Sequence, residues 1–136
     1  MSEFVVDPVI ASLTQTITDW PLSRLFVFND SRYHWGLLVP RRPNIVEMCD
    51  LSAEDQAQMM KEIVQLSNII RTLPGVEKLN VGNLGNMVLQ LHVHVIGRFE
   101  GDPAWPGPVW GVAGAEPYTP EALAQAVRAA SAALGL

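Results

Sequence analysis

Two of the three histidines in this 136-residue chain lie one residue apart, inside an apolar run. The run VLQLHVHVIGR carries His92 and His94 at alternate positions, and Gln90 stands two residues before His92. Because side chains alternate across a β-strand, the three would share one face, with the imidazoles roughly 6–7 Å apart. A neutral imidazole is a nucleophile at physiological pH, and a neighbouring histidine can stay protonated beside an anionic phosphate. The pattern therefore favours chemistry at a phosphorus centre.

Two other interpretations fit the same histidines. They could be partly exposed side chains on the solvent face of an edge strand, since a catalytic role needs convergent partners. They could also supply two ligands of a metal site, with His34 as a third. Catalytic zinc sites usually have three well-placed ligands, often including a carboxylate, and the strand supplies none beyond its histidines. The spacing therefore ranks a phosphate site above a metal site, and no metal is expected.

The N-terminal third of the chain predicts a short helix followed by a hairpin. Asp7 before Pro8 is typical of a helix start, and apolar residues then recur at helical spacing: Ile10, Leu13 and Ile17. Two β-type runs follow, RLFVFND and WGLLVPRRP. The turn formers Asn29, Asp30 and Ser31 separate these runs, which predicts a hairpin.

The rest of the chain predicts two helices and two strands. Ser52 opens a main helix that extends to about Arg71, and KLNVGNLGN predicts a strand with a Gly/Asn turn. The histidine strand follows at about residues 87–97, with its valine face packed against a helix. A Trp/Pro loop and a last helix capped by Thr119 occupy residues 101–136. We therefore expect one α+β domain over residues 1–136, an antiparallel sheet with helices packed on it.

Composition excludes several classes of protein. Nine basic residues against fourteen acidic ones give a net charge of −5, which argues against nucleic-acid binding through many phosphate contacts. The single cysteine, Cys49, permits no internal disulfide and no thiolate metal cluster. The first residues lack the pattern of a signal peptide, and no apolar run reaches the roughly 18 residues of a membrane span. A cytoplasmic protein without membrane or nucleic-acid partners is expected.

The segment QLHVHVIGR resembles the signature of the histidine triad (HIT) superfamily, in which three histidines alternate with apolar residues. Gln90 stands where the first histidine usually lies. The similarity extends through LFVFNDSRYHWGLLVPRR, KLNVGNLGN and GDPAWPGPVWG, roughly residues 20–111, and looks like a bacterial branch of the family. The resemblance implies a HIT-like fold, a homodimer, and a nucleotide hydrolase or transferase that forms a nucleotidyl-histidine intermediate.

The resemblance also implies roles for particular residues. His92 would attack the α-phosphorus, His94 would contact phosphate oxygens, and Gln90 would orient them. Ribose would lie against Asn29 and Asp30, and the phosphate site would be lined by Asn80, Gly85 and Asn86. The implied ligand is a purine nucleotide or nucleotide conjugate, such as a dinucleoside polyphosphate, a nucleoside phosphoramidate or an adenylylated amine. No cofactor is required, although magnesium can travel with a polyphosphate substrate.

The sequence allows more than one role for each of four residues, and more than one function for the protein. Trp35 occupies the place where many family members carry a histidine, which bears on substrate preference. Arg98 either meets phosphate or lies in solvent at the strand end. Trp105 and Trp110 either pack, at a dimer interface for example, or stack on a base. The competing functions are a nucleotide-binding module without turnover and a metal-dependent hydrolase.

Overall fold

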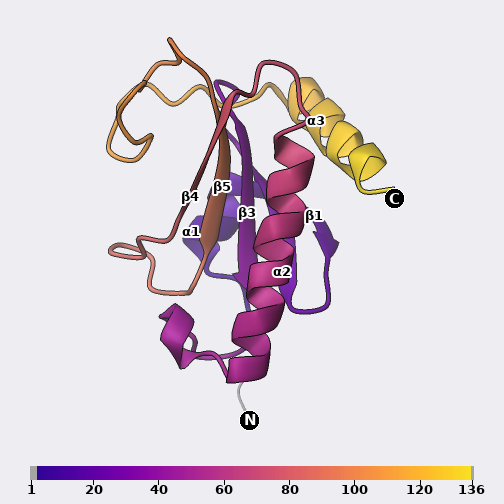
Figure 1. Ribbon diagram of the computed structural model, residues 1–136, viewed down its shortest axis with the longest axis vertical. Helices are drawn as coiled ribbons and strands as arrows, with labels where there is room; N and C mark the ends of the chain where they lie inside the picture. Colours follow the sequence, from indigo (N-terminus) through magenta and orange to yellow (C-terminus); the bar gives the residue numbers. More distant parts are fainter. Residues whose placement is uncertain (1–2, 136) are drawn as a thin grey trace.

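The computed structural model describes residues 3–135, and its centre is a five-stranded antiparallel sheet (Figure 1). The strands are β1 (Thr14–Asp19), β2 (Ser23–Phe28), β3 (His34–Pro40), β4 (Lys78–Gly82) and β5 (Val93–Arg98), in the order β1-β2-β3-β5-β4. The helices are α1 (Pro8–Leu13), α2 (Ala53–Ile70) and α3 (Pro120–Ala133), with a 3₁₀ turn at Met48–Asp50. The predicted α+β class and the antiparallel sheet are confirmed. The ends of the predicted domain, at Met1, Ser2 and Leu136, lie outside the described residues.

Helix α2 covers one face of the sheet and begins where the sequence predicts. The Ser52 side chain accepts a hydrogen bond from the Asp55 amide at 3.1 Å, which caps the helix. The buried stripe of α2 packs on the strand residues Val93 and Val95, so the prediction for the valine face is confirmed. Close approach requires small residues: a Cβ at Gly36 would lie 2.9 Å from a Leu66 methyl group.

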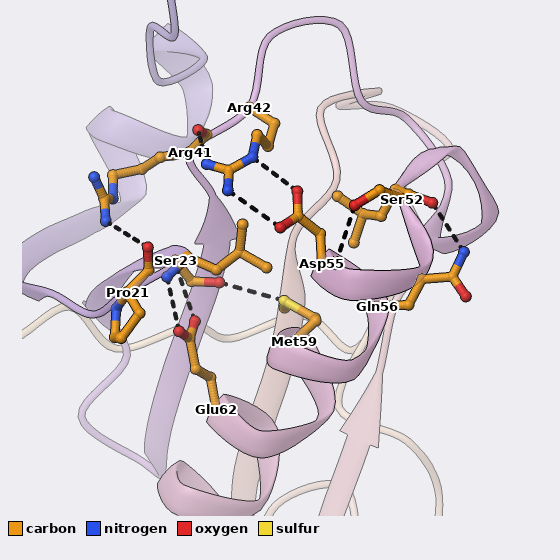
Figure 2. Close-up of polar contacts among 11 residues, drawn as sticks. Pro21, Ser23, Arg41, Arg42, Ser52, Asp55, Gln56, Met59 and Glu62 are labelled. Carbon is orange, nitrogen blue, oxygen red and sulfur yellow. Dashed lines mark hydrogen bonds and ion pairs between the residues drawn. The ribbon is translucent and has the colours of Figure 1, made fainter.

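Polar contacts fix the first half of α2 to β2 and to the end of β3 (Figure 2). The carboxylate of Glu62, 1% exposed, accepts hydrogen bonds from the amides of Leu22 and Ser23, each at 2.8 Å. The Arg42 guanidinium donates to both oxygens of Asp55, at 2.8 and 3.1 Å. Glu62 is thus a buried charge whose oxygens are used by backbone donors, which makes it a structural residue.

The other face of the sheet is covered at one end by the N-terminal segment. Ile10 of α1, with Phe4 and Val6 before it, packs on Phe26, Leu37 and Val39. At the other end, an aromatic cluster forms around β3 and β5, consisting of Tyr33, Trp35, Ile96 and Val109 with Phe28 and Trp110 against them. Leu37 pairs directly with His94, so the side chain of His94 lies on this face between the two clusters.

Two sequence-based boundaries are wrong. The N-terminal helix ends at Leu13, and Ile17 belongs to β1, where β-branched Thr14, Thr16 and Thr18 favour an extended chain and β2 supplies an antiparallel partner. The histidine strand begins at Val93, because the preceding residues leave the β3 ladder. The last helix is confirmed, with the Thr119 hydroxyl capping Ala122. No helix in residues 3–135 is long and apolar enough to span a membrane.

Candidate functional site

His92, immediately before β5, and His94, within it, lie side by side, with their ring centroids 5.1 Å apart and their planes inclined by 72°. Both are largely buried, with 9% of His92 and 6% of His94 exposed. The sequence-based expectation that the two imidazoles lie side by side is confirmed. A pair of imidazoles at this separation can address one small group from two directions, one as nucleophile and one as hydrogen-bond donor.

A backbone carbonyl determines which nitrogen of His92 carries the proton. His92 Nδ1 lies 2.7 Å from the carbonyl oxygen of Gln90. A carbonyl can only accept a hydrogen bond, so Nδ1 must donate, and in a neutral ring the lone pair then belongs to Nε2. The structure thus leaves Nε2 of His92 as a basic, nucleophilic atom beside His94.

An indole contacts the other histidine. Trp35 Nε1 donates a hydrogen bond to His94 Nδ1 at 2.9 Å. Trp110 approaches the same ring from another side, edge to face, with centroids 5.4 Å apart. Burial, and to a lesser degree the nearby charge of His92, lower the pKa of His94 to about 3. In the free protein His94 is therefore neutral, whereas the expectation of a protonated histidine concerns the state with an anionic phosphate bound.

Gln90 contributes to the site through its backbone and not through its side chain. Its amide group bridges the N-terminal segment: Oε1 accepts from the Asp7 amide at 2.8 Å, and Nε2 donates to the Val5 carbonyl at 2.9 Å. Gln90 precedes β5, and both polar atoms of its side chain are used by the N-terminal segment, so neither is given to the histidines. The expectation that its side chain orients them is corrected, and the carbonyl of Gln90 orients His92 instead.

Asn29 and Asp30 fasten the β2–β3 turn to the segment that precedes α3. Asn29 Oδ1 accepts from the Tyr118 amide at 2.8 Å. Asp30 is 1% exposed, and its two oxygens accept from the Arg32 side chain and amide, with a further bond from the Glu116 amide. Asp30 has no exposed oxygen for a ribose hydroxyl, which corrects the expectation for that residue. Asn29 keeps the two protons of its amide group for other partners.

Arg98 is a structural cation, so neither sequence-based interpretation of it is right. It is 1% exposed, and it donates to both oxygens of Asp102 at 2.7 and 2.9 Å. It also donates to the Gly107 carbonyl and, at 2.7 Å, to Oδ1 of Asn80. Asn80 therefore orders Arg98, and its side-chain oxygen is not free for other donors.

The Gly/Asn turn after β4 contains the two remaining predicted residues. Gly85 has a φ of +72°, a conformation that side chains other than that of glycine rarely adopt. Asn86 is exposed and makes no hydrogen bond within residues 3–135. This turn can therefore present a backbone amide and a free side-chain amide to a ligand.

The sequence did not predict that two tryptophans, Trp35 and Trp110, contact His94. A signal existed for Trp35, since alternation puts it on the face of Leu37, which pairs with His94. His34 therefore lies on the opposite face, where its Nε2 is 3.2 Å from the Pro74 carbonyl. The proposed third metal ligand is thus separated from the histidine pair by the sheet. No cluster of three or more His, Cys, Asp or Glu fit for a metal exists in the described part of the chain.

An apolar cavity lies away from His92 and His94. It has a volume of about 420 Å³ and lies between α2 and α3, where Leu66, Ile70, Ala126 and Ala130 line it. None of the predicted catalytic or nucleotide-binding residues borders it. We place the functional site at the histidine pair, because tautomers and donors are arranged there, whereas the cavity offers almost only apolar surface.

Comparisons with known proteins identify what the whole chain is similar to. A model of the HIT domain matches residues 12–101. A histidine triad protein from Bradyrhizobium japonicum is 42% identical, with 98% of this chain and 97% of that chain covered and a TM-score of 0.89. A histidine triad protein from Marinobacter aquaeolei is 39% identical, with 98% of each chain covered and a TM-score of 0.94. A third, from Sinorhizobium meliloti, is 40% identical over 97% of this chain and 95% of that chain, with a TM-score of 0.89. No match was found among curated proteins.

Proposed function

The chain belongs to the HIT domain family, and from this premise we propose that it hydrolyses or transfers nucleotide conjugates at the α-phosphate through a nucleotidyl-histidine intermediate on His92. The substrate classes are dinucleoside polyphosphates, nucleoside phosphoramidates and adenylylated amines, with a purine base. No cofactor is required, and magnesium can enter with a polyphosphate substrate.

The hydrogen bond from His92 Nδ1 to the Gln90 carbonyl supports this proposal most strongly. It leaves the Nε2 lone pair available for attack on phosphorus. In the first step the N–P bond forms and the bond from phosphorus to the leaving group breaks, so that the leaving group departs with its electron pair. In the second step a water oxygen attacks phosphorus and loses a proton to solvent, and the N–P electron pair returns to Nε2. Another acceptor in place of water gives transfer.

The residues around the histidine pair suit the phosphate oxygens in such a reaction. His94 is proposed to donate to them, aided by the Gly85 backbone and the free amide of Asn86. Asn29, through its amide protons, remains the proposed ribose contact. Asp30 and Asn80 are not proposed as nucleotide contacts, because their oxygens accept hydrogen bonds from Arg32 and Arg98 respectively.

A homodimer is proposed because apolar side chains are exposed along the open edge of the sheet. In β4 and the turn after it, Val81 is 50%, Leu84 45%, Met87 96% and Leu89 62% exposed. An unpaired edge strand with apolar neighbours is a surface that proteins usually cover. Sedimentation at micromolar concentration tests this, and a monomer contradicts it. The cytoplasm is the proposed location, since Cys49 is an exposed free thiol, which suits a reducing compartment.

A substrate panel tests the proposed activity. The protein is incubated with a dinucleoside polyphosphate and with an adenosine phosphoramidate, each with and without a chelator. Turnover of the phosphoramidate that survives the chelator is the expected result. Binding without turnover would favour the nucleotide-binding module, and loss of phosphoramidate turnover with the chelator would favour a metal-dependent hydrolase.

A further inference from the structure

We propose that Trp35 is a positioning residue for the reaction: its indole N–H holds His94 as the neutral tautomer that carries its proton on Nε2, which makes Nε2–H the donor to the substrate phosphate. The catalytic meaning of this inference rests on the proposed function, whereas the state of His94 in the free protein does not. Trp35 thus performs for His94 the orienting role that the sequence pattern suggests for Gln90.

The chemistry of the two partners determines the tautomer. An indole N–H can donate a hydrogen bond and cannot accept one. Because Trp35 Nε1 donates to His94 Nδ1 at 2.9 Å, Nδ1 must offer its lone pair. The single proton of the neutral ring is then on Nε2. Protonation of His94 would put an N–H on Nδ1 facing the indole N–H, so the same hydrogen bond also opposes the charged state.

Trp35 is itself held firmly enough to act in this way. It is 7% exposed and stacks on Phe28, with ring centroids 4.1 Å apart and an interplanar angle of 17°. Tyr33 packs edge-on against it at 6.1 Å. Its backbone is fixed in β3, paired with Ile96 of β5. The indole N–H is therefore directed by a rigid aromatic cluster and a central strand.

The second indole beside His94 has a different arrangement. Trp110 touches the ring edge to face, but its own Nε1 is buried and has no hydrogen-bond partner in the described residues. Only one of the two tryptophans thus donates to His94. Since both border the same imidazole, Trp110 provides a matched control for the loss of an indole next to His94.

The other titratable groups on this face do not donate to His94 Nδ1. His92 is the nearest, and its Nδ1 is engaged by the Gln90 carbonyl. The Tyr33 hydroxyl has no hydrogen-bond partner in the described residues, so it does not donate to His94, and burial raises the pKa of this phenol. Arg98 is paired with Asp102. Opposite His94, β3 supplies Leu37 and β4 supplies Gly82, neither of which titrates.

The two histidines therefore receive opposite tautomers from two different hydrogen bonds. A carbonyl that accepts leaves His92 with a lone pair on Nε2, and an indole that donates leaves His94 with a proton on Nε2. One ring can attack phosphorus while the other donates to its oxygen, and neither needs to be charged beforehand.

The first test measures the hydrogen bond directly in the unaltered protein. With ¹⁵N-labelled protein near neutral pH, a scalar coupling across the N–H···N bond between Trp35 Nε1 and His94 Nδ1 is expected, and the His94 ring nitrogens should show the Nε2–H tautomer. No such coupling is expected for Trp110. A proton on Nδ1 of His94, or a missing Trp35 coupling, would overturn the proposal without any variant having to fold.

The second test compares Trp35→Phe with Trp110→Phe. Trp35→Phe keeps an aromatic ring but removes the donor, so the pKa of His94 should rise by about half a unit to one unit, the equivalent of one lost hydrogen bond. With a phosphoramidate substrate, kcat should fall about tenfold while KM changes less than about threefold. Trp110→Phe should keep the Nε2–H tautomer.

The outcomes separate this inference from the proposed function. An unchanged tautomer and an unchanged pKa in Trp35→Phe would overturn the role of Trp35, even if the protein turns over every substrate. A Trp35–His94 coupling in a protein that turns over no substrate would support the hydrogen bond and contradict the proposed function alone. Loss of the tautomer in Trp110→Phe as well would also overturn the proposal, since burial and not the indole donor would then hold it.

Discussion

The depressed pKa of His94 should make the stability of the protein depend on pH in a way that one substitution removes. The pKa is about 3 in the folded protein and about 6.5 in an unfolded chain. The unfolded state therefore takes up the proton first as the pH falls, and the folded state loses stability below about pH 6.5. The contribution of His94 to the free energy of unfolding is fully present above about pH 7.5. It decreases steadily as the pH falls toward about 3.

The expected loss follows from the two pKa values. Relative to pH 7.5, the free energy of unfolding should fall by about 1.4 kcal/mol at pH 5.5 and by about 2.7 kcal/mol at pH 4.5 through His94 alone. His94→Gln is the matched variant, because its amide oxygen can accept the Trp35 hydrogen bond but cannot titrate. The carboxylates are the same in both proteins, so their contributions cancel in the difference between them.

Urea denaturation of both proteins at these pH values measures this difference. The unfolding free energy of the unaltered protein minus that of His94→Gln should decrease by these amounts as the pH falls, because only the unaltered protein carries the His94 contribution. Parallel curves between pH 7.5 and pH 4.5 would contradict a lowered pKa of His94, because His94 would then have the same affinity for a proton in the folded and unfolded chains.

Three further predictions concern other residues of the site. Asn86→Ala should raise KM for a nucleotide conjugate by about fivefold to tenfold, because one hydrogen bond to the ligand is lost. Steady-state kinetics measure this change, and an unchanged KM and kcat would show that Asn86 does not belong to the site. Asp102→Ala should lower the free energy of unfolding by about 3–5 kcal/mol, since it leaves the buried Arg98 guanidinium unpaired; a loss below about 1 kcal/mol would contradict the structural role. Gln90→Ala should speed hydrogen exchange of the Asp7 amide yet leave kcat within about threefold, because the carbonyl that orients His92 remains; a dead enzyme would restore a catalytic role to the Gln90 side chain.

Much of the fold could be predicted because local signals and packing agree. Ser52 and Thr119 cap helices where the sequence predicts caps, and the two runs around Asn29 form the expected hairpin. One exception is Ile17, whose helical spacing from Leu13 is overridden by strand pairing with β2, a tertiary effect that no local pattern contains.

The site could be predicted only in part, for a similar reason. The proximity of His92 and His94 follows from their spacing, but the partners that fix their tautomers come from a backbone carbonyl and from Trp35 in another strand. Arg98 and Asp30 look like ligand contacts in the sequence because charged residues are usually exposed, and the structure pairs each with an opposite charge inside the protein.

The central claim, covalent catalysis by His92, is tested most directly by the mass of the protein during turnover. The protein is mixed with excess adenosine phosphoramidate and quenched in alkaline denaturant, which preserves an N–P bond, before intact mass measurement. Covalent catalysis by His92 predicts an added mass of one adenosine monophosphate. This added mass should be absent in His92→Ala and still detectable in His94→Ala. The same added mass in His92→Ala, or turnover by His92→Ala at the rate of the unaltered protein, would contradict it.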